Sequence, residues 1–175
     1  MPENDGAANH LPGATLPRTA LPATDGSLVE LAALFGPAVV FAYPRTGQPG
    51  SAVPPAWDAI PGARGCTPQV CAYRDSHRAF LELGVRVFGL STQVTDYQRE
   101  AVERLNLSYP LLSDAGFALT DALGLPTFEF DGARLLKRLT LLVRDGTIEH
   151  VTYPVFPSDR DAAEALAYVT RNVAR

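Results

Sequence analysis

Two short apolar runs, residues 37–43 and 85–91, constrain the fold more than any other feature of the chain. Each is a continuous β-prone segment, which is typical of a strand buried on both faces of a sheet. Residues 67–83, between them, have helical spacing, and Gly84 follows as a helix stop. A second helix is predicted over 96–107, an extended segment over 109–112 and a short helix over 117–123. This β-α-β-α order predicts an α/β fold with a partly parallel sheet.

Two hairpins are predicted at the margins of that sheet. The turn signal Asp25-Gly26 joins strand-like residues 14–21 to 27–31, and Asp145-Gly146 joins residues 135–143 to 147–153. No internal repeat or second domain is indicated. We therefore predict one domain over residues 14–175, preceded by a flexible tail over residues 1–13 that offers little apolar surface for docking.

The last helix is predicted from a capping pattern. Ser158 with Asp161 forms a candidate capping box for a helix that runs to about residue 173. Its inner face is expected to carry Leu166, Val169 and Val173.

Composition excludes several classes of partner. The chain has 175 residues, of which 46% are hydrophobic and 19% charged, enough for one globular core. With a net charge of -4 and no block of Lys or Arg, a nucleic acid partner is not expected. No apolar run approaches the roughly 18 residues of a membrane span. The first twenty residues lack the apolar core of a secretory signal. We expect a soluble, cytoplasmic protein with no membrane association.

The only two cysteines, Cys66 and Cys71, carry the first indication of chemistry. Cys66 follows a Pro- and Gly-rich loop over residues 45–65 and stands where the predicted helix begins, so the helix N-terminus favours its thiolate form. Five residues of intact helix rise about 7.5 Å, beyond the roughly 7 Å Cα separation that a relaxed disulfide allows. A bond between the two cysteines therefore requires the first helical turns to unwind, and Pro68 should leave them easy to open.

Spacing alone leaves other interpretations of the pair open. Both cysteines are equally well explained as small buried hydrophobic residues. A zinc site needs about four ligands, whereas the nearest histidine, His77, is far along the helix, and His10 and His150 have no ligand-type spacing. No metal is expected. No glycine-rich phosphate motif is present either, so no cofactor is predicted.

The segment around the pair resembles the catalytic segment of the Q-type peroxiredoxins, also called bacterioferritin comigratory proteins. The resemblance is carried by Gly65-Cys66-Thr67, by Cys71 and by Tyr73-Arg74-Asp75, with further similarities at residues 41–44, 88–91, 109–114 and 138–146. It covers about residues 14 to 174. It implies a thioredoxin-like fold, a peroxidatic Cys66, a resolving Cys71, and thioredoxin or a similar dithiol as reductant. A monomer or weak homodimer is expected.

The resemblance also assigns a role to Arg138. This residue matches the family arginine that supports the thiolate and polarises the peroxide, as a permanently charged guanidinium can. By sequence position alone, Arg138 would be a solvated strand charge.

The chain departs from the family pattern before Cys66. The hydroxyl residue usual three positions before the reactive cysteine is replaced by Ala63, and a segment containing Trp57 is inserted after Pro44. Thr46 or Ser51 is the candidate for a substitute hydroxyl. Trp57 is most simply a packing anchor for the loop.

The predicted function is a thiol-dependent peroxidase acting on hydrogen peroxide and organic hydroperoxides through a Cys66 sulfenic acid and a Cys66–Cys71 disulfide. One alternative is a non-catalytic redox sensor or binding protein on the same scaffold, suggested by Ala63 and the rebuilt loop. A thioredoxin-like disulfide reductase is a weaker alternative, because such enzymes usually carry Cys-x-x-Cys.

Overall fold

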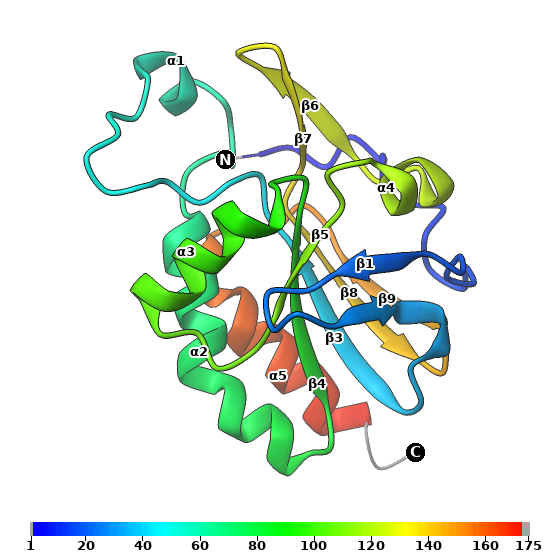
Figure 1. Cartoon of the computed structure of the whole chain (residues 1–175). Helices are drawn as coiled ribbons and strands as arrows, with labels where there is room; N and C mark the ends of the chain where they lie inside the picture. The colour runs from blue at the N-terminus through cyan, green and yellow to red at the C-terminus, as the bar shows by residue number, and fades with distance from the viewer. Residues whose placement is uncertain (1, 173–175) are drawn as a thin grey trace.

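The computed structural model of the chain describes residues 2–172 and contains one five-stranded mixed sheet (Figure 1). Its strand order is β5-β4-β3-β8-β9. The parallel part comprises β3 (Pro37–Ala42), β4 (Arg86–Ser91) and β5 (Leu111–Ser113). The antiparallel part comprises β8 (Leu139–Arg144) and β9 (Thr147–Thr152), with β8 next to β3. The predicted α/β fold with flanking helices is confirmed, and so is the placement of the 145–146 hairpin on the far side of the sheet.

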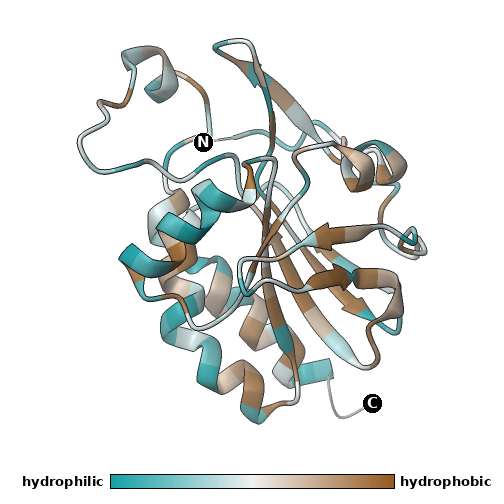
Figure 2. Ribbon diagram, viewed as in Figure 1, coloured by the Kyte–Doolittle hydropathy of each residue, from teal (hydrophilic) through white to brown (hydrophobic). Residues whose placement is uncertain are grey.

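Alternate residues of the central strand β3 serve two separate cores. Val39 and Phe41 pack against α2 (Cys66–Glu82) and α5 (Asp161–Asn172) on one face. Ala38 and Val40 belong to the core on the other face, with N-terminal residues and α4 (Ala118–Leu123). Figure 2 shows the resulting concentration of hydrophobic residues along the sheet. This two-sided burial explains why β3 is apolar throughout.

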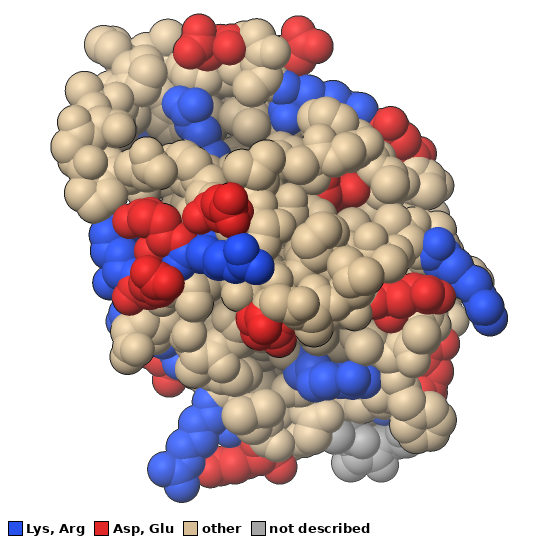
Figure 3. Space-filling view, viewed as in Figure 1, with Lys and Arg blue, Asp and Glu red and all other residues tan. Residues whose placement is uncertain are grey.

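The remaining elements lie around this sheet. The predicted N-terminal hairpin is confirmed as β1 (Ala20–Pro22) and β2 (Leu28–Glu30), followed by a short 3-10 turn, η1 (Leu31–Ala33). Its first strand is shorter than the predicted range of residues 14–21. The helix α3 (Thr95–Leu105) forms where it was predicted and packs beside β5. Within residues 2–172, no helix is both long and apolar enough to cross a membrane. On the face in Figure 3, acidic and basic side chains lie interspersed rather than gathered into one field.

The predicted strand over residues 135–143 is wrong in one respect. The chain first forms a separate hairpin of β6 (Thr127–Phe130) and β7 (Ala133–Leu136), and β8 begins only at Leu139. The turn of this hairpin is Asp131-Gly132, where both residues have positive φ, a two-residue turn signal that the prediction overlooked. Arg138 therefore lies in the break between β7 of this hairpin and β8 of the five-stranded sheet.

The N-terminal segment is also not the flexible tail that was predicted over residues 1–13. Leu11 is fully buried, Ala8 is nearly so, and the amide of Gly13 donates a hydrogen bond to the carbonyl of Ile148 at 2.8 Å. Ala8 and Leu11 help to dock this segment, because they belong to the core beside α4 and β9.

The predicted capping box does not form. A 3-10 turn, η2 (Ser158–Arg160), leads into α5, and η2 has no side-chain cap hydrogen bond. The carboxylate of Asp161 is buried instead of capping the helix. Val169 is buried and Leu166 packs at the edge of the core, as expected, whereas Val173 lies outside the described residues.

The loop over residues 45–65 contains a helical turn and packs against β6. It contains one turn of helix, α1 (Pro55–Asp58), which the prediction of a loop without helix did not include. Trp57 of this turn is buried edge-to-face against Phe130, with ring centroids 4.9 Å apart, and lies beside Phe128. The aromatic contacts fix the inserted loop on β6.

Candidate active site

Cys66 is the first residue of α2, and a sharp turn at Gly65 places it there. Gly65 has φ of +100°, a conformation that favours glycine, and a Cβ at this position would lie 2.1 Å from Oγ of Ser158. The Cys66 side chain is 5% exposed, and its Sγ lies 3.7 Å from the carbonyl oxygen of Ala63. The sulfur is therefore held at the N-terminus of α2, where the unpaired amides favour negative charge.

Arg138 reaches the same sulfur from the other side. Arg138 is 4% exposed, and its Nη2 lies 3.4 Å from Sγ of Cys66. The same nitrogen donates to the carbonyl oxygens of Gly62, Ala63 and Arg64 at 3.1 to 3.4 Å. Arg138 thus organises the turn that precedes Cys66 and brings a positive charge into contact with the sulfur. The structure brings these two predicted site residues together.

A buried polar network behind Arg138 was not predicted. Nη1 of Arg138 donates to Oε1 of Gln69, and Nε2 of Gln69 donates to the carboxylate of Asp161 at 2.7 Å. The hydroxyl of Thr140 also donates to Asp161, at 2.8 Å. Burial raises the pKa of Asp161, and the hydrogen bonds from Gln69 and Thr140 oppose that rise. The network fixes the orientation of the guanidinium toward Cys66.

The sequence carried signals for two members of this network. Gln69 stands one helical turn after Cys66, so it is a polar residue on the face of α2 that points into the protein. Asp161 was interpreted as half of a capping box, because a first-turn carboxylate usually has that role. Only the packing of α5 against α2 reveals that Asp161 faces Gln69.

Cys71 lies in α2 but away from the Cys66 pocket. Five residues correspond to about 140° around a helix, so the two side chains leave α2 in different directions. Cys71 is partly buried at the edge of the core that contains Tyr109, and both thiols are free. With α2 intact from residue 66 to residue 82, the two sulfurs are on separate sides of the helix.

Thr46 does not take the place of the missing hydroxyl. It is fully buried, its hydroxyl donates to Oε1 of Gln93 at 3.4 Å, and its carbonyl accepts from the hydroxyl of Tyr97 at 2.9 Å. These contacts hold Thr46 beside α3, so the structure does not bring it to Cys66. Ser51 is exposed in the loop. The Ala63 methyl packs against Trp57 and Leu135, and the Ala63 carbonyl faces the sulfur.

A pocket of about 450 Å³ opens at Cys66. The inserted loop forms one wall and the start of α2 forms another. The lining residues are Arg45, Gly47, Val53, Trp57, Ala63, Arg64, Gly65, Cys66, Thr67 and Pro68. This volume is within the range that small-molecule sites occupy, so a small organic molecule has room beside the sulfur.

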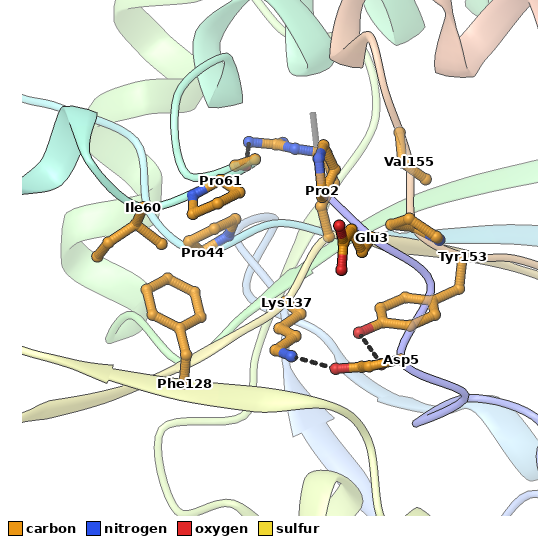
Figure 4. A pocket seen from close by; sticks show the side chains of 13 residues that line it. Pro2, Glu3, Asp5, Pro44, Ile60, Pro61, Phe128, Lys137, Tyr153 and Val155 are labelled. Carbon is orange, nitrogen blue, oxygen red and sulfur yellow. Dashed lines mark hydrogen bonds and ion pairs between the residues drawn. The ribbon is translucent and has the colours of Figure 1, made fainter.

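A second cavity of about 270 Å³ also borders Arg138 (Figure 4). The N-terminal segment closes it, since the carboxylate of Asp5 accepts from Nζ of Lys137 at 2.6 Å and from the hydroxyl of Tyr153 at 2.8 Å. Pro2, Ile60, Pro61, Phe128 and Val155 give it largely apolar walls. In residues 2–172 no three His, Cys, Asp or Glu side chains are grouped to hold a metal ion.

Comparison with known proteins identifies the family of the chain. Residues 11–167 match the redoxin family. The chain is 30% identical over 158 residues to "Peroxiredoxin Q, chloroplastic" of Suaeda salsa, covering 90% of this chain and 66% of that protein. It is 28% identical over 155 residues to the protein of the same name from Oryza sativa subsp. japonica, covering 88% and 64%. The chain thus spans slightly less than two thirds of the length of these relatives.

Solved structures show the same fold. Peroxidoxin BcpB from Mycobacterium tuberculosis superposes with a TM-score of 0.75 at 28% identity, covering 93% of this chain and 97% of that one. Peroxiredoxin Q from Xanthomonas campestris gives 0.72 at 20% identity, covering 90% and 96%, a likeness that concerns the fold alone. The chain therefore belongs to the redoxin family, in the group of the Q-type peroxiredoxins.

Proposed function

We propose that this protein is a thiol-dependent peroxidase that reduces hydrogen peroxide and organic hydroperoxides, with Cys66 as the peroxidatic residue. The observation that carries the proposal is the contact between the Arg138 guanidinium and Sγ of Cys66, at 3.4 Å, at the N-terminus of α2. A positive charge and unpaired helix amides together favour the thiolate, which is the nucleophile that peroxide reduction requires.

In the first step the Cys66 thiolate attacks the terminal oxygen of the hydroperoxide. An S–O bond forms, the O–O bond breaks, and the leaving oxygen takes a proton and departs as water or an alcohol. Cys66 becomes a sulfenic acid. Arg138 donates hydrogen bonds to the peroxide oxygens and stabilises the negative charge that moves onto the leaving oxygen.

In the second step the Cys71 thiol attacks the Cys66 sulfenic acid, which forms a disulfide and releases water. Because the two side chains leave α2 in different directions, the first turns of the helix must unwind before the sulfurs meet. Thioredoxin or a similar dithiol then reduces the disulfide and is itself oxidised. A monomer or weak homodimer is sufficient, because Cys66, Cys71 and Arg138 belong to one chain.

The proposal requires a reducing compartment, since both cysteines must be returned to thiols. We place this protein in the cytoplasm, as expected from its composition. The plant relatives above are named chloroplastic.

The test is sustained peroxide turnover with thioredoxin and its reductase, for wild type, Cys66→Ser and Cys71→Ser. We expect turnover in the wild type and none in Cys66→Ser. Cys71→Ser should consume peroxide once and then accumulate sulfenic or overoxidised Cys66. If the wild type oxidises once, slowly, and does not turn over, the protein is a redox sensor on this scaffold and the proposal fails.

A further inference from the structure

The pocket at Cys66 has a positively charged residue whose charge nothing in the proposed reaction uses. Arg45 lines the pocket, and its guanidinium carbon lies 4.4 Å from the centroid of the Trp57 ring and 5.1 Å from that of Phe130. These cation–π contacts hold the guanidinium against the aromatic wall of the pocket, and its fork of N–H donors can bind a carboxylate there. Among the described residues, Arg45 has no carboxylate partner within salt-bridge distance.

The two other arginines near the pocket already have partners on the protein. Arg64 is paired with Asp58, and Arg138 is engaged with Cys66 and the Gln69 network. The residues that line the pocket, all in the described part of the chain, include no Asp or Glu. A ligand that enters the pocket therefore meets one unpaired cation, Arg45, on an aromatic wall.

We propose that the preferred substrates are organic hydroperoxides that carry a carboxylate, with the carboxylate held by Arg45 while the peroxide lies at Cys66 and Arg138. A guanidinium binds a carboxylate through two parallel hydrogen bonds, which gives orientation as well as attraction. The Trp57 ring and Val53 supply apolar contact for the carbon skeleton between the two groups. This inference rests on the proposed peroxidase function. Arg45 is then a specificity-determining residue that takes no part in the chemistry, since hydrogen peroxide has no group to reach it.

The test uses three hydroperoxides with the same reacting centre: cumene hydroperoxide, its para-carboxylate derivative, and the methyl ester of that derivative. The measured quantity is the ratio of kcat/KM for the carboxylate to kcat/KM for the ester, which cancels any general loss of activity in a variant. For the wild type we expect a ratio of about five, the upper end of what a partly exposed ion pair contributes. Raising the salt concentration toward 1 M should reduce it, because the charges are then screened within about 3 Å.

Three variants separate the contact from other effects. Arg45→Gln should bring the ratio to about one, and Arg45→Lys, which keeps the charge, should retain most of it. Arg78→Gln removes the same charge from an exposed position on α2 and should leave the ratio unchanged.

A wild-type ratio near one, or an unchanged ratio in Arg45→Gln, overturns the inference while leaving the peroxidase proposal intact. If neither these three hydroperoxides nor hydrogen peroxide oxidises Cys66, both proposals fail.

Discussion

Arg138→Met is the substitution that most directly tests how the site activates Cys66. Methionine replaces the unbranched stem of the arginine side chain with apolar atoms and removes every hydrogen-bond donor of the guanidinium. The contact at 3.4 Å to Sγ is lost, together with the hydrogen bonds to Gln69 and to the carbonyl oxygens of residues 62–64.

The magnitude follows from the contact to the sulfur. Two unit charges 3.4 Å apart attract by about 5 kcal/mol at an effective dielectric constant of about 20, before the cost of burying the guanidinium is subtracted. A charge-assisted hydrogen bond contributes a net amount of about 1.5 to 3 kcal/mol. Since each 1.36 kcal/mol changes a rate about tenfold, the rate constant for Cys66 oxidation should fall by roughly 10- to 150-fold.

The assay is stopped-flow oxidation of the reduced protein by hydrogen peroxide under single-turnover conditions, with unfolding curves measured on the same samples. Arg134→Met is the matched control, because Arg134 lies on β7 only four positions earlier and pairs with Asp121 at the surface. It should change the rate by less than about twofold. A folded Arg138→Met protein that reacts within threefold of the wild type would refute the role given to this guanidinium.

Three further results are expected. Gly65→Ala should lower the free energy of unfolding, measured in urea, by about 1 to 3 kcal/mol, because alanine is strained at a φ of +100° and its Cβ meets Ser158. An unchanged midpoint of urea unfolding would contradict the geometry of this turn. Burial raises the pKa of Asp161 in the folded protein, so the folded protein keeps the carboxyl proton to a higher pH than the unfolded chain does. This proton binding stabilises the fold below pH about 4, and the stabilisation is lost as the pH rises through the pKa of Asp161 in the folded state. Asp161→Asn should therefore reduce the pH dependence of the free energy of unfolding in this range. If the curves of wild type and Asp161→Asn run parallel, Asp161 is not the cause of this dependence. Asp5→Asn should speed hydrogen exchange at the amide of Ala7 and leave the free energy of global unfolding unchanged, because Asp5 holds the N-terminal segment to Lys137 and Tyr153. Equal exchange rates in Asp5→Asn and wild type would show that these contacts do not hold the segment.

Much of the fold could be predicted from the sequence because its signals are local. The run over 37–43 is apolar throughout and the run over 85–91 is largely so, and the structure buries them as β3 and β4 except for the partly exposed ends Pro37 and Arg86. The Asp-Gly turns at 25–26 and 145–146 predicted two hairpins correctly. The N-terminal segment was misjudged because docking depends on Leu11 finding a gap in a core that other parts of the chain build, which no local pattern records.

The site residues likewise divide into those with a local sequence signal and those without one. Cys66 stands out by its position at a helix start, and Arg138 was identified by resemblance, although nothing local distinguishes it from a solvated arginine. Gln69 and Asp161 are 92 positions apart in the chain, and only the packing of α5 on α2 joins them. Thr46 illustrates the opposite error: its residue type suited the missing hydroxyl, but its backbone and side chain are bound to Gln93 and Tyr97.

The central claim is that Cys66 reduces peroxide and is then resolved by Cys71. The measurement that tests it most directly is intact mass and cysteine mapping of the reduced protein after one equivalent of hydrogen peroxide, in the wild type and in Cys71→Ser. The account predicts a Cys66–Cys71 disulfide in the wild type and a single added oxygen on Cys66 in Cys71→Ser. Oxidation spread equally over both cysteines, at the rate of an ordinary thiol, would contradict it.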